Sequence, residues 1–577
     1  MALIARDAQD RHTGRMTGSN VLAPHPAISA IVEQRRRGRV RTIASRVVLV
    51  LAVLGLLSAA VHEIWRDMGL VRDVVPGLVV HTARPTLVLV SVVLLLTARG
   101  LRRGHRLAWL GTMAALAVSV VVHLAKGLDV VSALVILVGI GWLAAQRAAF
   151  PVLPTRRDVR RAVAWLVAGV VLVVVLVVGV AVWAVATDAS DEQIDRLGKL
   201  LAPVTYLLVV VFVVALLWTL LSPRRPGRLS PEDHRDERER ARLVVQRYGS
   251  GTLDYFALRD DKDWFFTGST VIAHSVRGGV CLVSPDPVGP PDELGLAWAE
   301  FLDHADDFGW SVTVIGAAAD RLPDYEASGL RTVYLGDEAI VDCPTFSLEG
   351  RSHKSLRQAV NRIERAGYTT TFHDPSATEP DLRAQIEQMS EESRHGETER
   401  GFSMTLSRLF QPEDTGLMLS VTRDPAGRVD AFCQWVPATA IGGWSLDVMR
   451  RRTDTEGLPN GLIDANIVAT IAHLAGRGER GLGLNFAMMR EVLEGDPADR
   501  SRVEALTRPL LQRLSQGTQM GTLSTFNEKF DPSWVPRYVV LDSAEFVATQ
   551  ALVLAGAEGV TEIPVIGRFL GNLGAAT

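Results

Sequence analysis

The chain has 577 residues, a hydrophobic content of 48%, a mean hydropathy of +0.18 and a formal net charge of −3. This length leaves room for a membrane domain and one or two soluble domains. The three cysteines, Cys281, Cys343 and Cys433, are far apart and form no CxxC motif, which argues against a disulfide framework and against a zinc site.

The region up to residue 221 alternates apolar runs with short polar loops. Its apolar runs approach the length of about 20 residues that an α-helix needs to cross a bilayer. They cover residues 47–65, 86–101, 107–124, 130–145, 163–186 and 200–221. We therefore predict a multi-span α-helical membrane domain over 47–221, preceded by an N-terminal arm over 1–46 that begins disordered.

Arginine is concentrated in alternate loops of this region. Basic clusters occur at 35–41, 99–106, 147–161 and 224–228, whereas the other loops are poor in arginine or acidic. Basic loops stay on the cytoplasmic side because their translocation is unfavourable. The pattern predicts a multi-pass protein of the cell membrane whose N-terminal arm and C-terminal region both lie in the cytoplasm.

The sequence beyond residue 221 has the composition of a soluble protein. A charged linker over 222–250, helical at 231–242, leads into the alternating strands and helices of an α/β region. Strands are predicted at 264–267, 271–274, 280–284, 311–315, 331–335, 369–372, 417–423, 429–435, 443–449, 483–486 and 539–541. Helices are predicted at 294–308, 355–366, 379–393, 462–476 and near 505–516. Two similar successions predict two units, 251–345 and 346–545, before a tail over 546–577.

The helix predicted at 355–366 has an apolar side and a basic side. Leu356, Val360 and Ile363 are three or four residues apart and form the apolar stripe. The basic residues on or just before the helix are Arg351, Lys354, Arg357, Arg362 and Arg365. Such a face suits the phosphates of RNA or of lipid, and it is equally consistent with a solvated helix surface.

Asp447 lies within the apolar strand predicted at 443–449. Alternation along this strand places Asp447 on one face together with Ser445 and Met449, and Arg450 on the other. A carboxylate among apolar strand residues is costly unless it is paired. Asp447 therefore marks either a buried ion pair or a site.

Aromatic residues, prolines and a lysine are close together in the segment 524–538. The pattern predicts a fixed loop in which Lys529 is held against the wall of a site, near Phe526 and Trp534. The alternative is a structural loop that its own aromatic residues pack.

Motifs of nucleotide-dependent and metal-dependent chemistry are absent from the sequence. It contains no GxxxxGK[ST], GxSxG or HExxH motif and no acidic metal triplet. The glycine-rich segment 477–483 follows a predicted helix and precedes a strand, whereas a loop for the pyrophosphate of coenzyme A would follow a strand and precede a helix. We therefore expect no metal and no organic cofactor.

A series of motifs follows one another along 251–541. They are Ser284-Pro-Asp286-Pro-Val288-Gly289, Gly336-Asp-Glu338-Ala339, Lys354-Ser-Leu-Arg357, Glu399-Arg-Gly401-Phe402-Ser403, Asp447-Val-Met-Arg450, Leu484-Asn485-Phe486-Ala487, and Phe526-Asn-Glu-Lys529-Phe530 with Trp534 and Arg537. In this order they resemble the aminoacyl-tRNA-dependent phosphatidylglycerol aminoacyltransferases, the multiple-peptide-resistance or lysyl-phosphatidylglycerol synthase family. The motif sequences are most similar to those of the actinobacterial members, whose fused tRNA synthetase we do not expect in this chain.

The resemblance implies two tandem acetyltransferase-like (GNAT-like) folds. It also implies transfer of an aminoacyl group, lysyl or alanyl, from aminoacyl-tRNA to a hydroxyl of phosphatidylglycerol. Such a product reduces the negative charge of the membrane and gives resistance to cationic peptides. The implied partners are aminoacyl-tRNA, phosphatidylglycerol, the membrane and a second copy of the chain, and no cofactor is implied.

The same resemblance implies roles for particular residues. Those implied as catalytic are Asp447, Arg450 and Lys529. Those implied to bind the phosphate of tRNA or lipid are Arg351, Lys354, Arg357, Arg365 and Arg537, and those implied to line the pocket are Phe402, Asn485, Phe526 and Trp534. Two alternatives stay open: the same donor with diacylglycerol or a peptidoglycan precursor as acceptor, and a non-catalytic, membrane-tethered lipid-binding module.

Overall fold

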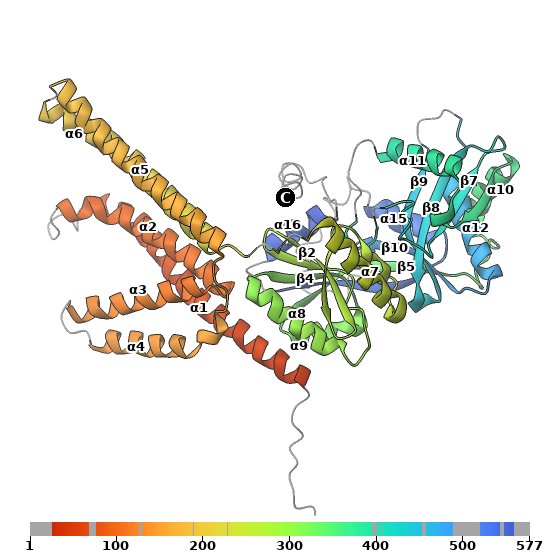
Figure 1. Cartoon of the computed structure of the whole chain (residues 1–577), viewed down its shortest axis with the longest axis horizontal. Coiled ribbons are helices and arrows are strands. Elements are labelled where there is room, and N and C mark those ends of the chain that lie inside the picture. Colours follow the sequence, from red (N-terminus) through yellow and green to blue (C-terminus); the bar gives the residue numbers. More distant parts are fainter. Residues whose placement is uncertain are drawn as a thin grey trace, which may run out of the picture.

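The computed structural model places a group of N-terminal helices beside an α/β region built on one large sheet (Figure 1). It describes residues 26–67, 77–125, 130–188, 190–224, 226–227, 229–394, 401–406, 408–452, 457–488, 520–542 and 547–558. The start of the predicted arm, the helix predicted near 505–516 and the end of the tail lie outside these residues.

The described part of the N-terminal region is helical, and each predicted apolar run coincides with part of a helix. The helices are α1 (Pro26–Asp67), α2 (Gly77–Arg102), α3 (Arg106–Ala125), α4 (Val130–Ala145), α5 (Arg156–Ala186) and α6 (Asp191–Leu220), with a 3-10 turn, η1 (Arg147–Ala149). Because α1 begins at Pro26, the later part of the predicted arm is helical. Within the described residues, α5 and the segment Lys199–Leu220 of α6 are long and apolar enough to cross a membrane. They support membrane association, and the six-span domain stays a prediction.

Capping residues mark the starts of α5 and α6. Thr155 accepts a hydrogen bond from the backbone N–H of Asp158, whose carboxylate accepts one from the backbone N–H of Thr155. Ser190 and Gln193 form the same reciprocal pair before α6. These pairs satisfy backbone donors that a helix start leaves without a partner. Both helices therefore begin in the polar segments that precede their apolar runs.

The described strands of the α/β region form one eleven-stranded sheet. They are β1 (Asp263–Thr267), β2 (Thr270–Arg277), β3 (Val280–Val283), β4 (Ser311–Ala318), β5 (Arg331–Asp342), β6 (Thr369–His373), β7 (Met418–Arg423), β8 (Val429–Ala438), β9 (Gly443–Arg451), β10 (Gly481–Met488) and β11 (Ser533–Leu541). Their order across the sheet is β1-β2-β3-β4-β11-β5-β10-β9-β8-β7-β6. Each half is antiparallel except for one parallel step, β3 beside β4 in the first half and β10 beside β9 in the second.

The two halves of the sheet exchange a strand. β11 lies between β4 and β5, and β5 in turn pairs with β10 of the second half. The predicted boundary at residue 345 therefore does not divide the sheet, because β11 follows the second unit in sequence and pairs within the first. Below, the first unit is the half around β1–β4 and the second unit is the half around β6–β10.

Helices cover both faces of each unit. They are α7 (Pro231–Tyr248), α8 (Leu294–Phe308), α9 (Leu322–Ala327), α10 (Lys354–Arg365), α11 (Pro380–Arg394), α12 (Leu462–Gly476), α15 (Met520–Glu528) and α16 (Val547–Ala557), with 3-10 turns η2 (Asp254–Leu258), η3 (Ala319–Arg321), η4 (Pro375–Ala377) and η5 (Thr439–Ile441). In β3, Cys281 packs in the core under α8 and its neighbour Leu282 packs in the core under α16. In the second unit, α11 and α12 bury Ile386 and Ile471 in separate cores. The helices predicted at 294–308 and 462–476 are confirmed.

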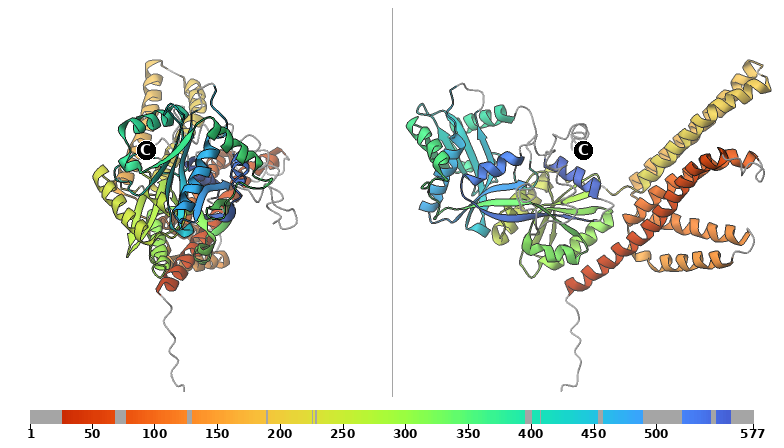
Figure 2. Two further views of the ribbon diagram at one scale, coloured as in Figure 1. Left: turned by 90° about the vertical axis from the view of Figure 1, so that its right-hand side faces the viewer. Right: turned by 180° about the vertical axis from the view of Figure 1, so that it is seen from behind.

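The N-terminal helices contact the first unit through charged side chains, at a contact that we call the joint. Arg37 and Arg41 of α1 pair with Asp303 at 3.3 Å and Asp306 at 2.8 Å, both on α8. Arg41 Nε also donates to the backbone carbonyl of Ala149 in η1. Figures 1 and 2 show the second unit at the far end of the molecule from the N-terminal helices. The first unit therefore lies between the helical region and the second unit.

Candidate functional site

The parallel strands of the second unit separate in the middle of the sheet. β10 pairs with β9 only at Leu482 with Trp444 and at Gly483 with Ser445. Among the described strands, β9 then continues beside β8 and β10 continues beside β5. Backbone groups and side chains between the two strands are thus left outside the ladder. We take this point as the centre of the candidate site.

Asp447 occupies a β-bulge at this level of β9. The pairing of β9 with β8 runs from Val448 directly to Leu446 and leaves Asp447 out of the ladder. Leu446 consequently packs in the core under α12, and Val448 packs in the core under α11. The strict alternation predicted for this strand is wrong here. Bulges re-aim side chains and are common beside active sites.

Asn485 occupies a second irregular position, on β10. A register shift against β5 falls between Gly483 and Phe486, and the backbone of Asn485 is left-handed, with a φ of 68°. Asparagine is one of the few residues besides glycine that adopt this conformation readily. Asn527 of α15 donates to the Leu484 carbonyl at 3.3 Å and holds the shifted segment. The predicted pocket residue Asn485 thus lies where the strands separate.

Both carboxylate oxygens of Asp447 accept hydrogen bonds from the protein. Oδ1 accepts from the backbone N–H of Leu406 at 2.8 Å, and Oδ2 accepts from the Gln434 amide at 2.7 Å. The same amide donates to the backbone carbonyl of Arg408 at 3.0 Å. A buried carboxylate needs donors of this kind, because its burial is otherwise costly. Asp447 therefore holds residues 401–406 and 408, which we call the site loop, against the sheet.

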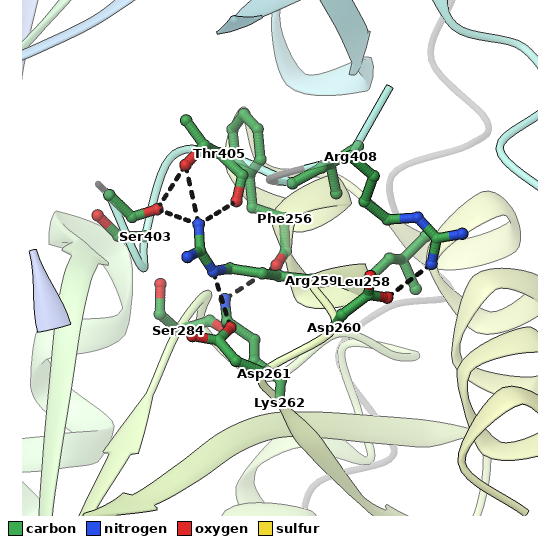
Figure 3. A network of polar contacts seen from close by, with 12 residues as sticks. Phe256, Leu258, Arg259, Asp260, Asp261, Lys262, Ser284, Ser403, Thr405 and Arg408 are labelled. Atoms are coloured by element: carbon green, nitrogen blue, oxygen red, sulfur yellow. Dashed lines mark hydrogen bonds and ion pairs between the residues drawn. The ribbon is translucent and has the colours of Figure 1, made fainter. Parts of the chain in front are cut away.

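The first unit holds the same loop through Arg259 (Figure 3). Nη1 of Arg259 donates to the backbone carbonyls of Gly401 at 2.9 Å and Thr405 at 3.0 Å, and to the Thr405 hydroxyl at 2.9 Å. Its Nε donates to Asp261 at 2.7 Å. Phe402, predicted to line the pocket, is fully buried in the core under α16. The site loop is therefore held from both units at the seam between them.

Lys262 is a buried lysine beside the site loop. Its Nζ donates to the backbone carbonyls of Phe256 at 2.9 Å and Ser284 at 2.7 Å, and lies 4.4 Å from the centre of the Phe402 ring. Burial lowers the pKa of Lys262 to about 7, because an ammonium loses its hydration there. Sequence reasoning assigned no role to Lys262 or Arg259. The signal for both is the charged run that contains them directly before β1.

Asp286 links the two neighbouring parallel strands of the first unit, β3 and β4. It accepts hydrogen bonds from the backbone N–H of Ala318 at 2.9 Å and from the hydroxyl of Tyr325. Burial raises the pKa of Asp286 to about 6, although both hydrogen bonds act in the opposite direction. The motif that begins at Ser284 thus ties the end of β3 to the end of β4.

Arg537 links the two exchanged strands. It is buried on β11, and its Nη2 lies 2.6 Å from Oε2 of Glu338 on β5. Thr252 donates to the same Glu338 oxygen at 2.8 Å. A buried arginine with a carboxylate partner is costly to separate from it. This position does not fit the phosphate contact predicted for Arg537.

The segment predicted as a fixed loop is instead a helix followed by a strand. Phe526 lies in α15 and Trp534 lies in β11, and both are partly buried against the core of the second unit. Lys529 directly follows α15, where its Nζ pairs with Asp464 of α12 at 2.9 Å and lies 4.7 Å from the Phe526 ring. The prediction is wrong because β5, a partner distant in the sequence, orders the segment from Ser533 onward.

The three residues predicted as catalytic lie at different positions of the second unit. Asp447 is in the bulge, Lys529 pairs with Asp464, and Arg450 lies opposite Phe432 in the ladder between β9 and β8. Their predicted catalytic roles stay predictions.

The basic side of α10 lies on the outside of the second unit. Leu356, Val360 and Ile363 are buried, which confirms the predicted apolar stripe. Figure 1 shows α10 at the end of the sheet that is farthest from α1–α6. The helix that carries these basic residues therefore lies at the end of the sheet away from the joint.

The basic residues around α10 differ in their contacts. Arg357 donates to the backbone carbonyl of Gly350 at 3.2 Å and so stabilises the turn before the helix. Arg351, Lys354 and Arg365 are exposed. The structure shows no hydrogen bond or ion pair from any of these three side chains to the described residues, and the contact between Arg351 and Lys354 is made by backbone groups. Only these three are placed to meet an external phosphate without breaking an internal contact.

A polar cavity of about 580 Å³ lies at the seam, beside the linker from the helical region. It is lined by Pro226, Gly227, Leu229, Pro231, His234, Arg235, Arg238, Glu239, Asp260, Asp263, Arg408, Gln411 and Glu413. Two ion pairs stabilise its walls. Arg238 pairs with Asp414 at 2.7 Å. Arg408 pairs with Asp260 at 2.6 Å (Figure 3). Because its walls carry charges of both signs, the cavity by itself selects neither an anion nor a cation.

Two units with antiparallel strands, one parallel step and helices on both faces define a pair of acyltransferase-like folds of the GNAT type on one sheet. The solved structure of L-PGS from Bacillus licheniformis shares this fold, with a TM-score of 0.50 and 24% identity over 58% of this chain and 99% of that chain. The predicted fold class is therefore confirmed for the α/β region.

The family follows from the sequence match. A family model described as "Phosphatidylglycerol lysyltransferase, C-terminal" matches residues 242–541, more than half of the 577-residue chain. The chain belongs to this family, as its motifs predicted.

Curated relatives agree with this placement. The lysylphosphatidylglycerol biosynthesis bifunctional proteins LysX of Mycobacterium marinum and Mycobacterium tuberculosis are 35% identical over 359 and 348 residues, or 62% and 60% of this chain. These matches cover 32% and 29% of the two proteins, so the chain spans about a third of the length of the curated relatives it matches.

Proposed function

We propose that the protein moves an aminoacyl group from aminoacyl-tRNA to a hydroxyl of phosphatidylglycerol at a membrane. The family description names this lipid, and the LysX relatives are named for its lysyl product. One observation carries the proposal: a continuous sheet has the N-terminal helices at one end and the exposed basic side of α10 at the other (Figures 1 and 2). A lipid and a polyanionic nucleic acid can therefore reach one protein from opposite ends.

We place the reaction at the cytoplasmic face of the cell membrane. Aminoacyl-tRNA is cytoplasmic, and the arginine-rich loops favour the same side for the α/β region. Arg41 and Arg224, from two of these basic segments, contact the first unit at Asp306 and Trp310. Aminoacylation of the lipid lowers the negative surface charge of the membrane and thereby reduces its attraction for cationic peptides.

The proposed reaction is an ester exchange. A glycerol hydroxyl of the lipid attacks the aminoacyl carbonyl carbon, and a new C–O bond forms. The bond from that carbon to the ribose oxygen of the tRNA breaks, and the hydroxyl proton passes to the ribose oxygen. The ester of aminoacyl-tRNA is already activated, so the transfer consumes no ATP. The protein contributes positioning, stabilisation of the oxyanion and a path for the proton.

The contacts of individual residues support a division of these tasks. Asp447 positions the site loop, since its oxygens face donors from Leu406 and Gln434. Arg450 and Lys529 supply positive charge for the substrate phosphate or the oxyanion. The exposed cations of α10 bind the phosphates of the tRNA, which lie beyond the reach of a membrane at the opposite end of the sheet.

Lipid extracts from cells that express the full chain test the proposal. Mass spectrometry is expected to find phosphatidylglycerol enlarged by one aminoacyl group, and the added mass identifies the amino acid. Membranes that carry the chain should form the same product from charged tRNA, and ribonuclease should abolish its formation. If the aminoacyl group is found on diacylglycerol or on a peptidoglycan precursor instead, phosphatidylglycerol is not the acceptor. A folded chain that forms no product would contradict the transferase function and favour the alternative of a non-catalytic, membrane-tethered lipid-binding module.

A further inference from the structure

An apolar groove of about 380 Å³ lies between α5 and α6. It is lined by Trp165, Val210, Val211, Val214, Ala215, Trp218 and Thr219. Both helices are long and apolar enough to cross a membrane, and Trp165 and Trp218 are 44% and 50% exposed. In a bilayer, a groove of this kind faces the acyl chains of lipids.

The contact between the two helices closes the groove at its end farther from the α/β region. The rings of Trp165 and Phe212 are 6.0 Å apart. One turn further along α5, Gly169 leaves room for Phe212, because a Cβ there would lie 3.0 Å from the ring. Phe212 thus fills the space between the helices below Trp165, and the groove is confined to the ends of α5 and α6 that adjoin the α/β region.

Arginines lie at the end of this groove that is nearer to the α/β region. The guanidinium of Arg99 lies 4.6 Å from the centre of the Trp218 ring, a cation–π contact from the last turn of α2. Arg161 is exposed and precedes Trp165 by four residues, which places both side chains on one side of α5. The groove is therefore apolar along its length and positively charged at one end.

The charged end adjoins the first unit. Leu221, Ser222 and Pro223 follow α6 directly. Pro223 packs on the turn between β2 and β3, where a Cβ added to Gly279 would lie 2.3 Å from the Pro223 ring. A headgroup held beside Arg99 and Arg161 would thus lie at the start of the chain segment that enters the α/β region.

We propose that this groove holds one anionic phospholipid, with an acyl chain along the groove and its phosphate between Arg99 and Arg161. Interfacial tryptophans anchor helices in many membrane proteins, but the paired arginines select a negatively charged headgroup. Resting on the proposed function, this occupant is a phosphatidylglycerol molecule bound beside the α/β region that aminoacylates it.

Native mass spectrometry of the full chain in detergent tests the occupant. After exposure to equal amounts of phosphatidylglycerol and phosphatidylcholine, the chain should retain the anionic lipid at least tenfold better. The double variant Arg99→Gln with Arg161→Gln should lose this preference, and Val214→Trp, which fills the groove, should lower retention of both lipids. Equal retention of the two lipids by the unaltered chain, or an unchanged preference in the double variant, would overturn the proposal.

Arg160→Gln is the matched control. Arg160 is exposed at the same end of α5, but it lies about 140° around the helix from Trp165. Its replacement removes one positive charge, as Arg161→Gln does at the neighbouring position, and should leave the lipid preference unchanged. If Arg160→Gln abolishes the preference as fully as the double variant does, general surface charge and not the groove selects the lipid.

Activity separates this proposal from the proposed function. If the chain aminoacylates phosphatidylglycerol, the double variant should raise the KM for lipid in mixed vesicles about tenfold, with kcat and the KM for tRNA unchanged. A chain that is inactive but retains phosphatidylglycerol as described contradicts the proposed function and supports the groove. An active chain whose KM for lipid is unchanged in the double variant contradicts the groove and leaves the function intact.

Discussion

The two units of the sheet share a strand pattern but present opposite charges on their outer helices. In the first unit, α8 carries Asp303 and Asp306, which pair with arginines of α1 at the joint. In the second unit, α10 lies at the end of the sheet away from the N-terminal helices (Figure 1). It carries Lys354 and Arg365, which are exposed. The acidic helix meets arginines of α1, and the basic helix faces solvent.

The parallel steps of the two units differ as well. At the end of β3, buried hydrogen bonds of Lys262 and Asp286 close the step. Where β9 and β10 separate, bulges place Asp447 and Asn485 out of register. A repeated fold can thus use one copy for docking and the other for a site, because each task changes only outer helices and strand ends. The predictions that follow test this division.

The largest effect is expected from Asp447→Ala in the second unit. The substitution removes the acceptor of the Leu406 N–H and one of the two acceptors of the Gln434 amide, and so releases the site loop. Turnover of lipid aminoacylation should fall by about 10²-fold or more, the loss typical of one misplaced transition-state contact. Steady-state kinetics of the full chain measure this effect, and thermal unfolding confirms that the variant folds.

Asp447→Asn separates positioning from direct chemistry. An asparagine keeps an acceptor for Leu406, and a flipped Gln434 amide can accept from its nitrogen. A positioning role predicts that this variant recovers most of the turnover that Asp447→Ala loses. Equal losses in the two variants would assign Asp447 to the reacting groups instead.

The strand exchange that joins the units is tested by Glu338→Ala. It leaves Arg537 buried without its carboxylate partner, which should lower the free energy of unfolding by about 3–5 kcal/mol. Arg331→Ala on the same strand removes an exposed side chain and should change it by no more than about 0.5 kcal/mol. Denaturant unfolding of the full chain should show both units losing stability together. A second unit that unfolds normally while the first is destabilised would contradict the shared strands.

Substitutions at the joint are expected to lower the free energy of unfolding by a smaller amount. Asp306→Asn weakens the pair with Arg41, a buried arginine, and should lower the free energy of unfolding by about 1.5–3 kcal/mol. Asp303→Asn affects a more exposed pair with Arg37 and should cost less than about 1 kcal/mol. Denaturant titration of both variants measures the difference. Equal, small losses would show that the joint is held by something other than the buried arginine.

The smallest effects are expected on α10. Lys354→Gln and Arg365→Gln should each raise the KM for aminoacyl-tRNA a few-fold and reduce its salt dependence by about one unit of slope. Arg357→Gln is the control, because Arg357 is engaged with the Gly350 carbonyl. Kinetics at several salt concentrations give the slopes. A raised KM for lipid, with the KM for tRNA unchanged, would reverse the roles of the two ends of the sheet.

The sequence by itself determined the features that depend on neighbours in the chain. Apolar runs located the N-terminal helices, and the spacing of Leu356, Val360 and Ile363 predicted the buried stripe of α10. The family motifs predicted the fold class and included both irregular positions of the site, Asp447 and Asn485. Such signals survive in a sequence because periodicity and motif spacing are local.

The tertiary structure alone decided which distant residues meet. Glu338 and Arg537 are 199 residues apart, and Arg259 reaches a site loop that starts 142 residues further along the chain. The bulge at Asp447 likewise appears only when β9 is paired with β8. A ladder or a buried ion pair depends on a partner elsewhere in the chain. Because the entropy of loop closure rises only slowly with loop length, that partner can lie at almost any distance along the sequence. No local pattern therefore records which strand pairs with which, or that Arg537 is buried while Lys354 stays exposed.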